Sequence, residues 1–154
     1  MSDMSDDQTL TSVTDRVRRL LVAADFKTEL NGENGFVLPF GEYVAVFLDV
    51  EEQRSDDGEF VRFPVECWAV VLRDVTVTPD VLEYLAFPPV FTWGGITSMR
   101  NDDGTALIVF RNVLLGDFLD EKELTNTVVT VASTADALIE ELHPRFGGKR
   151  LGEE

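Results

Sequence analysis

The stretch from Asn112 to Val129, NVLLGDFLDEKELTNTVV, decides how the chain folds because it changes character twice. It begins as an apolar, strand-like segment, passes through an acidic bend and continues as a threonine-rich segment with helical spacing. The bend contains Asp117, Asp120, Glu121 and Glu123 beside a single lysine. Two interpretations are open: a catalytic or metal-binding carboxylate site, or the junction between a strand and a helix.

After the bend, apolar residues recur in steps of three and four, which predicts one face of a helix that extends to about His143. Asp120 and Glu123 stand three residues apart, an acidic variant of the capping box. Pro144 and then Gly147-Gly148 predict the end of the helix. The apolar positions are Leu124, Val128, Val131, Ala135, Leu138 and Leu142.

Before this junction, the sequence predicts two more helices and two groups of strands. Apolar spacing predicts a helix at 9–25, and Thr78 followed by Pro79 predicts the start of a short helix that ends at Pro88-Pro89. Period-two alternation and turn residues predict the strands. The expected strands are 36–40, 43–50, 61–71, about 95–101 and 105–115. The order α-βββ-α-ββ-α predicts an α+β domain in which helices pack on a twisted antiparallel sheet.

The length of 154 residues fits one domain with a hydrophobic core of its own. We expect residues 1–8 to form a disordered acidic N-terminus. The single domain is predicted to occupy 9–146, and 147–154 to form a flexible C-terminal tail.

The net charge of −16 disfavours a nucleic-acid partner, because phosphate contacts need clustered lysine and arginine. The acidity is explained by solubility and self-repulsion, or by a basic partner or a salt-rich cytoplasm. No apolar run approaches the ~20 residues of a membrane span, and the first residues do not resemble a signal peptide, so no membrane association is expected. One cysteine, Cys67, excludes an internal disulfide and indicates a cytoplasmic location.

The sequence offers few residues for catalysis, metal binding or cofactor binding. His143 is expected to lie at a helix C-terminus and Cys67 on the apolar face of a strand, where a thiol is inert. Asp56-Asp57 and Asp102-Asp103 fit turns rather than a calcium loop. We therefore expect no catalytic residue, no metal and no cofactor.

Aromatic residues are the remaining candidates for a binding site. The segment FPPVFTWGG at 87–95 is either a core plug under a rigid loop or an apolar lip for a peptide. The outer side of the first strands is covered either by a helix or by a partner. The candidate partner-binding residues are Tyr43, Phe47, Trp68, Phe87, Phe91 and Trp93.

The order of elements, together with LLGDFLDEKEL (114–124), VASTADALIEEL (131–142) and VTVTPDVLEYLA (75–86), resembles the YbjN-like branch of the type III secretion chaperone-like superfamily, particularly its actinobacterial peptide-binding chaperones. The resemblance covers about 9–143. It implies a secretion chaperone-like domain that is non-enzymatic and homodimeric and holds extended client segments. The segment AFPPVFTWGG at 86–95 departs from the family pattern.

The favoured hypothesis is a cytoplasmic, chaperone-like or regulatory adaptor that holds a protein or peptide segment, with basic clients favoured by the acidic surface. One alternative is a small hydrolase-like enzyme that uses acids of the bend from Asp117 to Glu123. Another is a purely structural homodimer.

Overall fold

The computed structural model describes residues 8–154. Residues 1–7 of the predicted disordered N-terminus lie outside the described part. The helices are α1 (Leu10–Ala23), α2 (Pro79–Ala86) and α3 (Glu121–Phe146), with a short 3-10 turn η1 (Gly116–Phe118). The strands are β1 (Glu29–Leu30), β2 (Gly35–Pro39), β3 (Ala45–Val50), β4 (Gln53–Arg54), β5 (Val61–Arg62), β6 (Pro64–Val75), β7 (Gly95–Arg100) and β8 (Ala106–Leu115). The predicted α+β class is confirmed.

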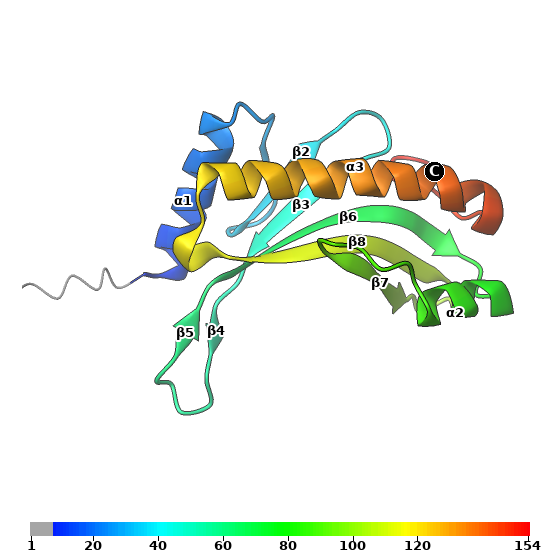
Figure 1. Cartoon of the computed structure of the whole chain (residues 1–154), viewed down its shortest axis with the longest axis horizontal. Coiled ribbons are helices and arrows are strands. Elements are labelled where there is room, and N and C mark those ends of the chain that lie inside the picture. The colour runs from blue at the N-terminus through cyan, green and yellow to red at the C-terminus, as the bar shows by residue number, and fades with distance from the viewer. Residues whose placement is uncertain (1–7) are drawn as a thin grey trace, which may run out of the picture.

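Six strands form one antiparallel sheet in the order β1-β2-β3-β6-β8-β7, and β4 pairs with β5 in a separate hairpin (Figure 1). The long strand β6 lies at the centre, between β3 and β8. Val65, Cys67, Ala69 and Val71 are fully buried along one of its faces, as their alternation predicts. Register shifts against β8 accompany the continuation of β6 to Val75, beyond the predicted end at residue 71.

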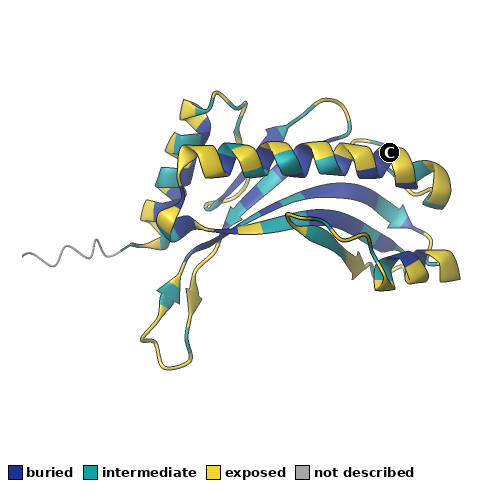
Figure 2. Cartoon of the chain, in the orientation of Figure 1, coloured by how far each residue is buried: buried dark blue, intermediate teal, exposed yellow. Residues whose placement is uncertain are grey.

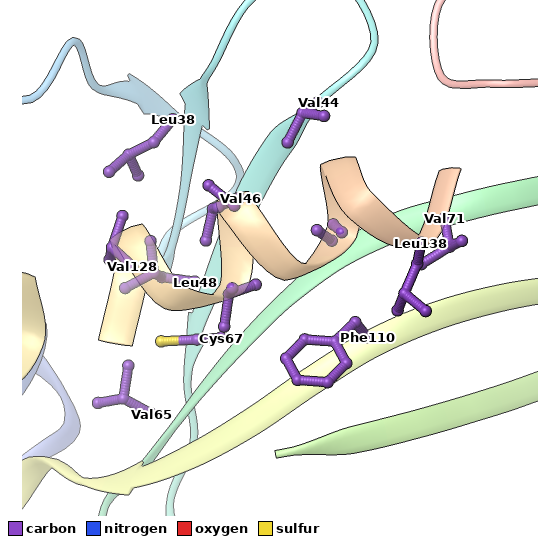
Figure 3. Close-up of a cluster of buried hydrophobic side chains, with 14 of the residues drawn as sticks. Leu38, Val44, Val46, Leu48, Val65, Cys67, Val71, Phe110, Val128 and Leu138 are labelled. Atoms are coloured by element: carbon purple, nitrogen blue, oxygen red, sulfur yellow. The ribbon is translucent and has the colours of Figure 1, made fainter. Parts of the chain in front are cut away.

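The helices cover one face of this sheet. Helix α3 crosses that face along its length, with its buried side toward the strands and its exposed side outward (Figures 1 and 2). Val128 and Leu138 of α3 lie over Cys67 and Phe110 of the strands (Figure 3). Val17 of α1 and Val81 of α2 belong to the same core, so all three helices pack on this side.

The opposite face of the sheet forms a second, open surface. Ala45, Val70 and Val109 are buried there but lie outside the main core. Their neighbours on this face, Phe47 and Trp68, are only half-buried. A sheet with one covered and one open face is what the polar-apolar alternation of the strands predicts.

Helix α3 ends at Phe146, so the predicted end near His143 is wrong. Pro144 lies inside the last turn, where its fixed φ suits a helix and only one backbone donor is lost. Gly147, with φ of 68°, caps the helix and donates its N–H to the carbonyl O of His143 at 2.9 Å. Glycine, rather than proline, therefore sets the boundary.

The segment 147–154, predicted as a flexible tail, makes backbone contacts with the rest of the domain. Lys149 forms an antiparallel bridge with Arg73, through N–H to O bonds of 2.8 Å in both directions. Gly148 is seated so closely that an added Cβ would lie 2.8 Å from the carbonyl O of Arg73. The tail thus pairs beside the distal part of β6, a backbone contact that leaves no hydrophobic pattern in the sequence.

Gly116, at the start of η1, lies in a position without room for a side chain. An added Cβ would lie 2.6 Å from the carbonyl O of Phe63 and 2.7 Å from Cγ1 of Val13. We predict that Gly116→Ala lowers the free energy of unfolding by about 1–3 kcal/mol, the usual cost of overpacking. Urea denaturation measures this value. The matched control is Gly95→Ala, where an added Cβ meets nothing within 4 Å; equal losses in both variants would contradict the prediction.

Candidate partner-binding site

The acidic bend is held together as a structural junction. The guanidinium of Arg16 donates to the carbonyl O of Asp117 at 3.1 Å and to that of Leu119 at 2.5 Å. The carboxylate Oδ2 of Asp117 accepts the backbone N–H of Phe63 at 3.2 Å. Oδ1 of Asp120 accepts the N–H of Glu123 at 2.7 Å, which makes Asp120 the N-cap of α3. Two of the acids thus have defined structural partners.

The other polar residues considered for chemistry occupy ordinary positions. Burial raises the pKa of the Cys67 thiol to about 12, so this side chain is not a nucleophile at neutral pH. His143 lies in the last turn of α3, as expected. Over residues 8–154, the structure brings together no group of three or more histidine, cysteine, aspartate or glutamate side chains that could hold a metal ion.

A groove of about 580 Å³ lies between the first half of α3 and the end of β8. Its walls are formed by Asn112 and Leu114 from β8 and by Glu123, Thr127 and Val129 from α3. The indole of Trp93, from the segment between α2 and β7, forms its rim. The lining is apolar in part and also offers hydroxyl, amide and carboxylate groups.

The loop that carries Trp93 is anchored by its neighbour Phe91. The Phe91 ring meets the buried ring of Phe110 edge-on, with 5.0 Å between centroids. Trp93 in contrast is 67% exposed and Phe87 is 82% exposed. Within the segment 87–95, Phe91 thus packs against the core, whereas the side chains of Phe87 and Trp93 are exposed.

The other aromatic candidates lie on a different surface. Phe47 and Trp68 stack on the open sheet face, with 4.3 Å between ring centroids, and the indole N–H of Trp68 donates to Oδ2 of Asp49 at 2.8 Å. Tyr43 lies in the turn before β3, beneath the guanidinium of Arg150, which is 3.8 Å from its ring centroid. The structure does not bring these three residues into the groove.

Sequence reasoning missed the polar side of the groove. The groove residues Asn112, Thr127 and Val129 lie far from Trp93 along the chain. In the sequence, Asn112 belongs to an ordinary strand pattern, and Thr127 and Val129 are poor helix formers. Val129 lies off the apolar stripe of α3 and is 48% exposed. A single exposed apolar side chain is common on protein surfaces, so the sequence carried no specific signal for the groove.

No protein-family model matches the sequence, and no relative was found among the curated proteins. Solved structures match its fold. The chain superimposes on the Yersinia pestis type III secretion chaperone SycH, determined in complex with a stable fragment of YscM2, with a TM-score of 0.51 and 11% identity over 84% of this chain and 99% of that one. It also superimposes on YbjN from E. coli, a proposed transcription regulator, with a TM-score of 0.57 and 16% identity over 85% of this chain and 91% of that one. The predicted YbjN-like and secretion chaperone-like fold is thereby confirmed.

None of the helices in the described part of the chain is long and apolar enough to cross a membrane.

We predict that Asp120→Ala lowers the free energy of unfolding by about 0.5–2 kcal/mol, because the N–H of Glu123 loses its acceptor. Urea denaturation measures the loss. Asp120→Asn keeps a side-chain oxygen and should remain close to the parent protein. If Asp120→Ala were as stable as the parent, the capping role would be wrong.

The ion pair between Arg150 and Glu153 in the C-terminal segment gives a prediction about pH. Hydrogen bonds from the Arg150 side chain and backbone N–H hold the pKa of Glu153 down to about 2, against an ordinary value of 4.5. Since the folded pKa is the lower one, this contact is complete above pH 4.5 and is lost as the pH falls through about 2. NMR titration of the Glu153 carboxyl measures this pKa.

Arg150→Gln should raise the pKa of Glu153 toward 4.5, whereas Lys149→Gln, which keeps those bonds, should leave it low. A Glu153 pKa that Arg150→Gln leaves unchanged would show that the contact does not form in solution.

Proposed function

We propose that this chain is a non-enzymatic binding module that holds an extended segment of a client protein in the groove between α3 and β8. The observation that carries the proposal is the exposed indole of Trp93 on the rim of a groove about 580 Å³ in volume. Large exposed aromatic side chains beside a concave surface are characteristic of binding sites, because burying them releases water from apolar area.

The segment that carries Trp93 has further exposed apolar side chains. Phe87 and Val90 of the same loop are 82% and 100% exposed, and Val129 faces the groove from α3. A client side chain set against Trp93 in the groove would also meet Val129. The structural neighbour SycH was determined with a partner fragment, and this supports a protein or peptide client here.

The charge of the chain favours a basic client. Its net charge of −16 attracts a positively charged segment over long distances, and Glu123 carries a carboxylate to the groove itself. The single buried cysteine fits a cytoplasmic location. The homodimer implied by the resemblance stays a prediction, which light scattering at several protein concentrations tests.

The alternative of a hydrolase-like enzyme at the bend is less favoured by the geometry. Asp120 caps α3, Asp117 accepts a backbone N–H of the neighbouring segment, and the bend carbonyls are held by Arg16. A general acid or base needs a side chain free to exchange a proton with a substrate. We therefore favour binding over catalysis.

We predict that Trp93→Ser weakens binding of a client captured under native conditions roughly tenfold or more, as for a central aromatic anchor. The same client should change the emission of Trp68→Phe, in which Trp93 is the remaining tryptophan. Fluorescence titration measures both. Leu30→Ser is the matched control, since Leu30 is 71% exposed on β1 and away from the groove. Equal affinities of Trp93→Ser and the parent protein would reject the groove as the binding site.

A further inference from the structure

The final part of β8, residues 112–115, extends beyond the last pair that β8 makes with β7, which is Gly95↔Arg111. On its other side this segment remains paired with β6, as far as Pro64↔Leu115. Among residues 8–154, no strand pairs with its outer side. Strand β8, which is the second strand from the edge of the sheet, is therefore itself an edge strand over residues 112–115.

Alternation of the ladder identifies which backbone groups face that edge. The N–H of Asn101 donates to the carbonyl O of Thr105 at 2.8 Å, so Asn101 and Thr105 form a hydrogen-bonded pair. In an antiparallel ladder such pairs alternate with pairs that are not hydrogen-bonded, so every second pair between β7 and β8 is hydrogen-bonded in the same way. The register then directs the backbone groups of Arg111 toward β7. By the same alternation, the N–H and C=O groups of Val113 and Leu115 point to the unpaired edge.

Gly94 directly precedes Gly95, the first residue of β7. The φ of Gly94 is +81°, and an added Cβ would lie 2.6 Å from the carbonyl O of Arg111 and 2.9 Å from the Phe110 ring. The preceding residues turn toward the core, where Phe91 packs on Phe110. If β7 continued in register, Trp93 would pair with Val113; instead, the chain leaves the sheet and opens the edge.

The exposed donor of this edge is capped by a neighbouring side chain. Oδ1 of Asn112 accepts the N–H of Val113 at 2.9 Å. Unpaired N–H groups on a sheet edge invite an added strand, and proteins protect them with local partners. The Asn112 amide is such a partner, and rotation of its side chain uncovers the donor.

The edge also borders the groove, because Asn112 and Leu114 belong to both. A strand laid along 112–115 would direct alternate side chains into the groove toward α3, with Glu123 within its walls. A second copy of this chain is a poor occupant, since each copy has a net charge of −16 and brings further acids. A basic side chain of a different protein fits the carboxylate.

We propose that residues 112–115 form a strand-addition site for an extended client segment. The backbone of that segment displaces the Asn112 side chain from the N–H of Val113, and one of its basic side chains pairs with Glu123. The site rests on the proposed function and specifies how the groove holds its client: the backbone pairs with Val113 and Leu115, and alternate side chains fill the groove.

The test uses a capped hexapeptide that alternates valine with threonine and carries one central arginine, measured by fluorescence anisotropy with the full chain. Val113→Pro removes the N–H that faces the edge and leaves the bonds to β6, because proline is tolerated where its missing donor faces outward. Binding should fall more than tenfold. Val113→Thr keeps the N–H and is the matched control, with parent affinity expected.

Two further substitutions should change the affinity for the hexapeptide in opposite directions. Asn112→Ala removes the competing acceptor and should strengthen peptide binding by roughly two- to tenfold, the value of one hydrogen bond. Glu123→Gln should weaken it by roughly up to fivefold at low salt, and this loss should vanish when glutamine replaces the arginine of the peptide. A peptide N-methylated at alternate positions should not bind the parent protein, which gives a test that needs no folded variant.

Equal binding by Val113→Pro and Val113→Thr, or by the methylated and parent peptides, would overturn strand addition while leaving client binding in the groove intact. Absence of hexapeptide binding at millimolar concentration would overturn it as well. The proposed function fails separately, if Trp93→Ser captures the native client as well as the parent protein does.

Discussion

Arg16 makes the contact on which the arrangement of the long helix depends. Its guanidinium binds the backbone carbonyls of Asp117 and Leu119, which lie between the end of β8 and the start of α3 and so have no regular ladder or helix partner. Charge-assisted bonds of this kind contribute about 1.5–3 kcal/mol each. With the bond from Phe63 N–H to Asp117, they join α1, the strands and α3 at one point. The direction of α3 across the sheet, and with it the groove, starts from this junction.

The two faces of the sheet satisfy their side chains in different ways. The helix face is apolar and closed, whereas the open face carries paired aromatic and charged side chains. Phe47 stacks on Trp68, whose indole N–H reaches Asp49, and Arg111 lies 3.3 Å from Glu66. The most exposed aromatic side chains in residues 8–154, Phe87, Trp93 and Phe118, lie outside the strands.

Sequence periodicity predicted the fold well because most elements bury one regular stripe. The α+β class, the order of the main elements and the N-cap at Asp120 were all predicted from local patterns. The end of α3 and the position of the tail were not, because both depend on backbone contacts: the cap at Gly147 and the bridge between Lys149 and Arg73. The prediction that carboxylates of the bend have structural roles follows from capping chemistry, but Arg16 lies far away along the chain and carried no signal.

The candidate site was predicted only in part, for a similar reason. Aromatic residues stand out in a sequence, so six of them were named as candidates; of these, Trp93 lines the groove and the other five do not. Whether an aromatic ring is buried depends on which segment turns inward, and Gly94 decides this by directing Phe91 to the core. Asn112 and Thr127 were missed because polar residues in a strand and a helix are common, and only the tertiary structure places them along one groove.

The position of Cys67 has a practical consequence for work with this protein. The thiol is fully buried in the central strand β6, next to both neighbouring strands, and its raised pKa keeps it protonated. A thiol reagent therefore reaches it only when the sheet opens, so the rate of modification reports the frequency of that opening. The chain contains one cysteine. In the purified protein this thiol therefore reports ligand-induced tightening without a substituted residue.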